Sequence, residues 1–149
     1  LNFALQLASS GNSLKKSINV IISNFYAKII ILGKYTGSHF NLFKEQIKNL
    51  VIDIANKNYT KIELEKINGR VNIIDLERVI DEYNRTIIPL PDSFEIDMNK
   101  VYHIKKENNL FVLIDLWTKE EGRSDLTLSL TCFLENNEPM IRIDDLEVL

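Results

Sequence analysis

The sequence contains very little cysteine and histidine, the residue types that most often form disulfides or bind structural zinc. Its 149 residues include one cysteine, Cys132, and two histidines, His39 and His103. A single cysteine cannot close a disulfide within the chain, and the common structural zinc sites need several cysteine or histidine ligands. We therefore expect no disulfide framework, no metal site and no other cofactor, and we expect Cys132 to be an inert buried thiol.

Long apolar runs and the common catalytic motifs are also absent. No uninterrupted apolar run reaches the roughly 18 residues that a membrane-spanning helix needs. The chain has no P-loop, no dinucleotide-binding glycine pattern and no zinc-protease helix. With 45% hydrophobic and 26% charged residues, the composition is that of a folded domain. We expect a cytoplasmic protein with no transmembrane segment and no catalytic residue.

Acidic residues are missing from the first part of the chain and concentrated in the second. Residues 1–75 carry ten Lys/Arg against five Asp/Glu, a balance of +5, whereas residues 76–149 carry eight against sixteen, a balance of −8. An acidic half disfavours nucleic-acid binding, which depends on neutralising phosphates, and favours a basic protein partner. The alternative is a solvated acidic face that serves only solubility.

Apolar residues recur at helical spacing three times before Pro89. Residues 14–32 form a basic amphipathic stretch, and three interpretations remain open: a packing helix, a helix on a membrane surface or partner, or a strand at its end. Residues 40–57 predict a clearer helix, with Asp53 on its polar face. The buried stripes that we expect for these two helices contain Ile18, Ile21, Ile22, Phe25, Ile29 and Leu32, and Phe40, Phe43, Ile47, Leu50, Val51 and Ile54.

Two shorter helices are predicted after these. Thr60 and Glu63 have the spacing of a capping box that opens a helix over 60–67, with Gly69 closing it. Asn72 is a suitable N-cap for a third helix, which ends with the ring of Tyr83 in the core. Prolines at positions 89 and 91 then end the helical region.

The apolar period changes from 3.6 to 2 in the last third of the chain. Strands are predicted at 101–105, 110–118, 125–134 and 140–149. In the third of these strands the leucines face the core, and Thr127, Ser129 and Thr131 face away from it. The apolar phase of the last strand shifts by one residue at Asp144 and Asp145, which predicts a β-bulge there.

Helices followed by an antiparallel meander predict an α+β domain, with N-terminal helices packed on a bent C-terminal sheet of about four strands. We expect residues 1–39 to be an N-terminal extension and residues 40–149 to be the domain itself. The order of elements resembles the cystatin-like and nuclear-transport-factor-like folds, in which a bent sheet and a helix can leave a cavity between them.

The connection between the second and third predicted strands is the best candidate site. It brings together Trp117, Glu120, Glu121, Arg123 and Asp125. The planar guanidinium of the arginine can bind a carboxylate with two hydrogen bonds, and the indole can anchor the loop or face a ligand. The plain alternative is a loop whose arginine pairs with its own acids.

Three further residues belong to the candidate binding set. Arg85 follows the third predicted helix and can hold an acid of the loop. Asp144 and Asp145 can join the loop acids in a carboxylate cluster suited to Ca²⁺ or Mg²⁺, but no spacing motif supports that interpretation. The alternative is that one aspartate caps the bulge and the other pairs with an arginine.

Three motifs carry a family resemblance from about residue 40 to the end of the chain. They are residues 82–86 (EYNRT), 116–128 (LWTKEEGRSDLTL) and 143–149 (IDDLEVL). With them the chain resembles an uncharacterised family of small bacterial domains. The resemblance implies no established activity.

Three functions remain open on the sequence alone. The first is a non-enzymatic protein-binding domain, such as an immunity-type protein that neutralises a toxin through the acidic half of the chain. The second is a small-molecule-binding or weakly catalytic protein that uses the cavity between sheet and helices. The third is a structural or dimerisation module. The sequence does not determine an oligomeric state.

Overall fold

The structure is a computed structural model that describes residues 13–19, 21–22 and 33–149. The chain divides into two compact units, residues 1–36 and 37–149. In the first unit, residues 13–19 and 21–22 are helical, and the rest of the predicted stripe, from Phe25 to Leu32, lies outside the described residues. None of the described helices is long and apolar enough to cross a membrane. The second unit carries the sheet and the candidate residues.

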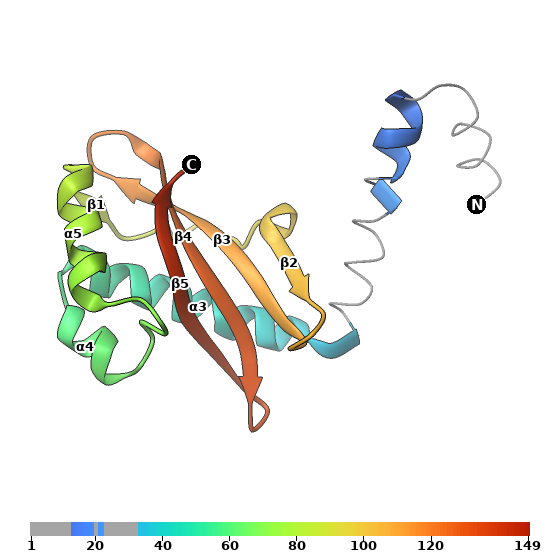
Figure 1. Cartoon of the computed structure of the whole chain (residues 1–149), viewed down its shortest axis with the longest axis horizontal. Helices are drawn as coiled ribbons and strands as arrows, with labels where there is room; N and C mark the ends of the chain where they lie inside the picture. Colours follow the sequence, from blue (N-terminus) through green and yellow to red (C-terminus); the bar gives the residue numbers. More distant parts are fainter. Residues whose placement is uncertain (1–12, 20, 23–32) are drawn as a thin grey trace. The chain divides into compact units, whose positions relative to one another are not determined.

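The second unit consists of helices followed by an antiparallel sheet, which confirms the α+β prediction (Figure 1). The sheet has five strands rather than four, because a two-residue strand next to the prolines was not predicted. The elements are α3 (Gly37–Ala55), α4 (Tyr59–Leu64), α5 (Ile73–Tyr83), β1 (Ile87–Ile88), a 3₁₀ turn η1 (Met98–Lys100), β2 (Val101–Ile104), β3 (Asn109–Thr118), β4 (Gly122–Glu135) and β5 (Glu138–Val148).

The sheet is centred on β3 and β4. Its order is β1-β3-β4-β5, and β2 pairs with the same edge of β3 as β1 does. Figure 1 shows α3 crossing behind the sheet, with α4 and α5 on the side of β5. The long strands are joined by tight turns, and Asn136 and Asn137 both have positive φ in the turn between β4 and β5.

The core lies between α3 and one face of the sheet. From α3 it receives Phe43, Ile47 and Leu50, each at most 1% exposed. From the sheet it receives alternate residues of β3 and β4, because successive side chains of a strand point to opposite faces. These are Leu110, Val112, Ile114, Leu116, Leu126, Leu128, Leu130 and Cys132. The space between sheet and helix, where a ligand cavity was considered, is therefore filled by apolar side chains.

The second face of β4 is less exposed than its polar sequence suggests. Thr127, Ser129 and Thr131 are only 1–2% exposed, although they alternate with the core leucines. Two of them are held by acids of the neighbouring strands, since the Thr127 hydroxyl donates to Asp115 and the Thr131 hydroxyl donates to Asp144. These side chains were expected to face away from the leucines, and their burial shows that this second face of β4 is covered as well.

Asp53 is buried at 6% exposure, although it was predicted on the polar face of α3. Lys61 Nζ donates to its carboxylate at 2.8 Å and Asn58 Nδ2 at 3.1 Å. Burial alone would raise the pKa of Asp53, but these hydrogen bonds and the charge of Lys61 hold that pKa below its ordinary value. The aspartate therefore stays ionised and ties α4 to α3.

The start of α4 also differs from the prediction, whereas the start of α5 agrees with it. α4 begins at Tyr59 rather than at the predicted capping box, so Thr60 lies inside the helix. The residue before it, Asn58, makes no side-chain cap because its amide is bound to Asp53. At α5 the Asn72 side chain accepts from Ile74 N at 2.9 Å, which confirms the predicted cap.

A loop after α4 covers part of the outer edge of β5. Ile143 N of the strand donates to Ile67 O of the loop at 2.7 Å. The loop turns at Gly69, which has φ +57°, and a Cβ built there would lie 2.7 Å from the carbonyl oxygen of Ile143. Both the backbone conformation and the close approach therefore require glycine at this position.

Replacing Asp53 should destabilise the domain in a pH-dependent way. Asp53→Asn leaves Lys61 beside a neutral amide, and we expect a loss of about 1–3 kcal/mol of unfolding free energy at pH 7. Because the folded pKa lies below 3.8, the contribution is present above that pH and is lost as pH falls through the folded pKa. Chemical denaturation from pH 7 to pH 2 measures it. Asp81→Asn is the control, since its ion pair with Lys57 is more than half exposed and should contribute under about 0.5 kcal/mol.

Gly69→Ala should destabilise the domain more than Gly37→Ala. The added methyl meets the Ile143 carbonyl and the positive φ is strained for alanine, so we expect a loss of about 1–3 kcal/mol. The matched control is Gly37→Ala, where nothing lies within 4 Å of the new methyl. Thermal unfolding of both variants tests this, and an equal melting temperature for the two would contradict it.

Candidate functional site

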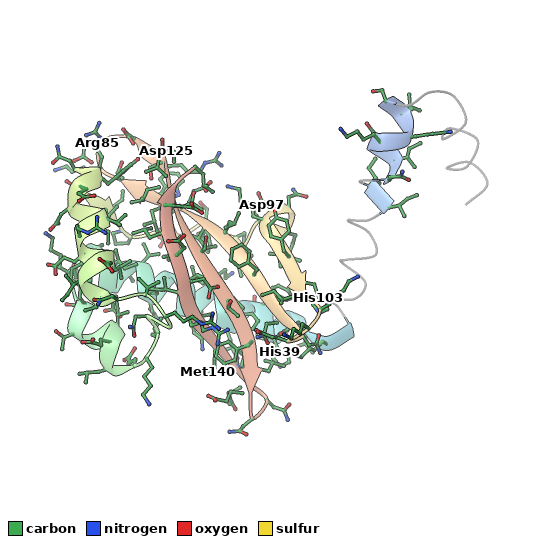
Figure 2. The ribbon with its side chains drawn as sticks, in the orientation of Figure 1. His39, Arg85, Asp97, His103, Asp125 and Met140 are labelled. Carbon is green, nitrogen blue, oxygen red and sulfur yellow. The ribbon has the colours of Figure 1, made fainter. Side chains whose placement is uncertain are left out.

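The predicted site loop separates into two groups that lie on different surfaces. One group is the acidic turn cluster, which we define as Tyr83, Arg85, Glu120, Glu121 and Asp125. It joins the end of α5 to the turn between β3 and β4. Figure 2 shows Arg85 and Asp125 at the same end of the sheet, with Met140 toward the other end. The second group contains Trp117 and Arg123.

Tyr83 is the centre of the acidic turn cluster. Its hydroxyl donates to Asp125 Oδ1 at 2.6 Å and lies 3.2 Å from Glu121 Oε2. Burial raises the pKa of the phenol to about 12, with hydrogen bonds to Asp125 and Glu121 contributing to the increase. The hydroxyl therefore keeps its proton at neutral pH and holds two carboxylates close together.

Glu120 is fixed by the short segment that follows α5. Thr86 N donates to Glu120 Oε2 at 2.9 Å, and the Thr86 hydroxyl donates to Glu120 Oε1 at 2.8 Å. The backbone and side-chain bonds from Thr86 lower the pKa of this carboxyl. Lys119 N donates in turn to Thr86 O at 2.9 Å, so the turn and the segment are joined through both backbone and side chains.

Arg85 pairs with the turn as the sequence suggested. Its Nε lies 3.1 Å from Glu121 Oε1, and its Nη1 donates to Asn84 O at 3.1 Å. Asn84 has φ +55° and ends α5, which directs the chain toward the turn. Arg85 and Glu121 are each 41% exposed, so the pair lies at the surface.

An irregular stretch of β4 brings Asp125 to this cluster. Trp117 pairs with Arg123 and Asp115 pairs with Thr127, so residues 124–126 of β4 lie opposite Leu116 alone. The Ser124 hydroxyl closes this bulge by donating to Leu116 O at 2.8 Å. Bulges redirect side chains and bend the strand. Asp125 therefore reaches Tyr83 on α5.

Arg123 makes a different ion pair from the one expected. Its Nε lies 3.6 Å from Asp115 Oδ2 on the neighbouring strand, and Lys100 Nζ lies 2.6 Å from the same oxygen. The expected pairing of Arg123 with Glu120, Glu121 or Asp125 is therefore wrong. The reason is the strand register, which places Arg123 opposite Trp117.

The two aspartates of β5 act locally. Ser129 pairs with Asp145 and Leu130 with Ile143, so Asp144 is the extra residue of a bulge, as predicted. Asp145 Oδ1 accepts from Leu146 N at 2.8 Å. Asp144 accepts from the Thr131 hydroxyl and lies 3.9 Å from Arg142 Nε. Neither aspartate joins the acidic turn cluster, and the described residues contain no group of three potential metal-ligating His, Cys, Asp or Glu side chains.

The sequence did not reveal three contributors to these surfaces. Tyr83 was assigned to the core because it continues the apolar stripe of α5, yet it is only half-buried and its hydroxyl faces the turn. Thr86 belongs to the motif of residues 82–86 but was given no role, and Asp115 carried no pattern that marks it. The signal that could have indicated Tyr83 is its amphipathic ring at the last position of a helix, directly before Arg85.

A surface hollow adjoins the acidic turn cluster. It has a volume of about 320 Å³ and an apolar floor that includes Ile54, Ile80 and Ile87. Arg85 and Glu120 contribute to its rim. Cys132 lies elsewhere, in the core, and burial raises the pKa of its thiol to about 12, which agrees with an unreactive cysteine.

Removing the Tyr83 hydroxyl should loosen the turn. For Tyr83→Phe we expect a loss of about 0.5–1.5 kcal/mol at pH 7, because Asp125 and Glu121 then face each other without the shared donor. The folded pKa is raised to about 12. The difference from wild type is therefore present below pH 10 and declines as pH rises toward 12. Denaturation from pH 7 to pH 11.5 measures it, with Tyr102→Phe, an exposed tyrosine, as control.

Comparisons with known proteins complete the description of the site. The chain is 27% identical over 145 residues to "Mitochondrial distribution and morphology protein 32" of the yeast Vanderwaltozyma polyspora, a match that covers 85% of this chain. The chain spans only 21% of that relative's length. No solved structure matches the chain. Residues 51–149, which include α4, α5, the whole sheet and the acidic turn cluster, match the family described as "Domain of unknown function (DUF7668)", and the chain therefore belongs to that family.

Proposed function

We propose that this domain binds a protein partner with a basic surface and does not catalyse a reaction. The observation that supports this most directly is the acidic turn cluster, in which three exposed or half-exposed carboxylates are held in fixed positions. An immunity-type role, in which the partner is a basic toxin, is the specific form of this proposal. The balance of −8 over residues 76–149 extends the acidic character beyond the cluster.

Fixed side chains favour binding because they lose little freedom when a partner docks. Ordering a long side chain at an interface costs about 0.5–1.5 kcal/mol. Glu120 is already held by Thr86, and Asp125 by Tyr83. Such pre-ordered carboxylates also give a defined negative potential, which steers a basic partner and discriminates against acidic ones.

The electrostatics of the cluster support binding more than proton transfer. A carboxylic acid that donates a proton near neutral pH needs a raised pKa. The hydrogen bonds from Thr86 lower the pKa of Glu120 instead. The Tyr83 phenol, with a pKa of about 12, holds its proton too firmly to exchange it readily at pH 7.

A second candidate function is the binding of a small molecule in the hollow beside the cluster. The observation that favours it is that two predicted site residues, Arg85 and Glu120, lie on the rim of a space of about 320 Å³. Opposite charges on one rim suit a small polar ligand with both signs of charge. Thr86→Ala, which removes the hydroxyl bond to Glu120 and keeps the backbone bond, should then weaken small-molecule binding in the hollow.

Affinity capture with a charge-matched control tests the protein-binding proposal. The immobilised domain should retain one protein from its native host. The two should form a 1:1 complex in size-exclusion chromatography, and their affinity should fall as the salt concentration rises. The double variant Glu121→Gln/Asp125→Asn should weaken this complex at least about tenfold, or roughly 1.4 kcal/mol.

The control removes two charges at the other end of the same strands. Glu135→Gln/Glu138→Gln changes net charge equally but lies at the turn between β4 and β5. Equal weakening by both double variants would indicate net charge alone. The absence of any stoichiometric partner would contradict the proposal.

A further inference from the structure

The edge of β3 that carries β1 and β2 is interrupted. Ile88 pairs with Trp117 and Val101 pairs with Val112. The twelve residues 89–100 therefore connect two points that are only four residues, 113–116, apart along β3. A continuous strand would need four residues there, so eight extra residues leave the sheet.

The prolines explain why the edge strand breaks at this point. Pro89 follows β1 directly and Pro91 is two residues further on, and neither can donate a hydrogen bond to β3. The chain turns after Pro91, where Phe94 N donates to Pro91 O at 2.9 Å, and it returns through η1 to β2. Among the described residues, no backbone hydrogen bond outside the strand ladders joins 89–100 to 113–116.

The hydrogen-bond phase of β3 identifies the backbone groups that face the interruption. Lys119 N donates to Thr86 O, so odd-numbered residues of β3 direct their N–H and C=O groups toward β1 and β2. Leu116 O accepts from Ser124 of β4, which places the even-numbered residues on the other edge. Leu113 and Asp115 therefore direct their N–H and C=O groups toward this edge, beyond the last pair of β2 with β3, Val101 with Val112.

A surface hollow occupies this stretch. It has a volume of about 220 Å³, and its lining includes Leu113, Asp115 and Trp117 of β3 together with Pro91 and Phe94 of the connection. We call the unpaired stretch of β3 and this hollow the edge gap. Its place beside β2 can be followed in Figure 2 from the labelled Asp97, which belongs to the connection.

We propose that the edge gap binds a short extended segment of a protein partner, about three residues long, which adds to β3 as a strand between β1 and β2. The proposal rests on the proposed function in one respect, which is that the bound segment belongs to a protein partner. Three residues of strand span roughly 10 Å, which matches residues 113–115. Backbone groups of Leu113 and Asp115 supply the hydrogen bonds, as in other cases where a peptide completes a sheet edge.

The charges around the edge gap select the side chains of that segment. Glu95, Asp97 and Asp115 line the hollow with Lys100 and Arg123, and both cations are already engaged by Asp115. Glu95 pairs in turn with Lys44, so Asp97 is the acid of this lining to which the described residues supply no cation. A segment that alternates a basic residue with a small or β-branched one complements Asp97 and the apolar lining by Phe94 and Trp117.

Hydrogen exchange with a defined peptide tests the proposal on the full chain. The probe is an end-capped pentapeptide of alternating threonine or valine and lysine. Without peptide, the amides of Leu113 and Asp115 should exchange faster than that of Ile114, which bonds to β4. Peptide at ten times its dissociation constant should slow exchange at Leu113 and Asp115 about tenfold. A weak complex has a dissociation constant of about 1 mM, so 10 mM peptide would nearly saturate it. If exchange at these two amides is not slower at that concentration, the proposal is overturned.

Methylated peptides separate strand addition from charge attraction. In a strand, alternate residues face β3, so N-methylation of one alternate set should abolish protection while methylation of the other set leaves it intact. Equal effects of the two sets would overturn the proposal. The variant Ser93→Trp, which fills the hollow from its rim, should abolish protection as well.

One further variant distinguishes this proposal from the proposed function. Glu121→Gln/Asp125→Asn changes the acidic turn cluster and should bind the pentapeptide as the wild type does. If the wild type shows no protection by the peptide, the edge-gap proposal fails and the proposal for the acidic turn cluster still stands. If the double variant keeps its 1:1 partner complex at full affinity, the proposal for the acidic turn cluster fails and the edge-gap proposal still stands.

Discussion

The bulge of β4 opposite Leu116 is the constraint on which the candidate surface depends. Three residues of β4 occupy the place of one, and the Ser124 hydroxyl stabilises the irregularity by bonding to Leu116 O. Without it, Asp125 would continue the alternation of β4 and would not meet Tyr83. The end of β4 would then lose its hydrogen bond to α5. A local irregularity of one strand therefore determines which acids are brought together.

The acids at this end of the sheet depend on a segment that is distant in sequence. Residues 83–86 supply a phenol, a guanidinium, a backbone amide and a hydroxyl to carboxylates 34 to 42 residues further along the chain. Tyr83 is the last residue of α5, and the other donors follow directly because the left-handed Asn84 ends the helix there. The position of the helix end is thus coupled to the shape of the acidic surface.

The fold was largely predictable from the sequence, whereas the site was predictable only in part. Hydrophobic period determined the helices, the long strands and the bulge at Asp144, because burial enforces that pattern locally. The pairing of Arg123 with Asp115 could not be predicted, since it depends on a register between strands. The burial of Asp53 could not be predicted from the period of α3, because its neutralising partner, Lys61, belongs to another helix. The two-residue β1 was too short to leave any period.

The outer edge of β5 is partly protected against the addition of a strand from a second copy of the chain. An open strand edge invites another chain to add to it, which is one route to fibrils. Here the loop that turns at Gly69 occupies the edge at Ile143, and the bulge at Asp144 interrupts the ladder next to it. Beyond the bulge, Asp145 and Glu147 are exposed. Like charges would approach each other if two such edges met, which opposes the addition of a second copy of the chain along this edge.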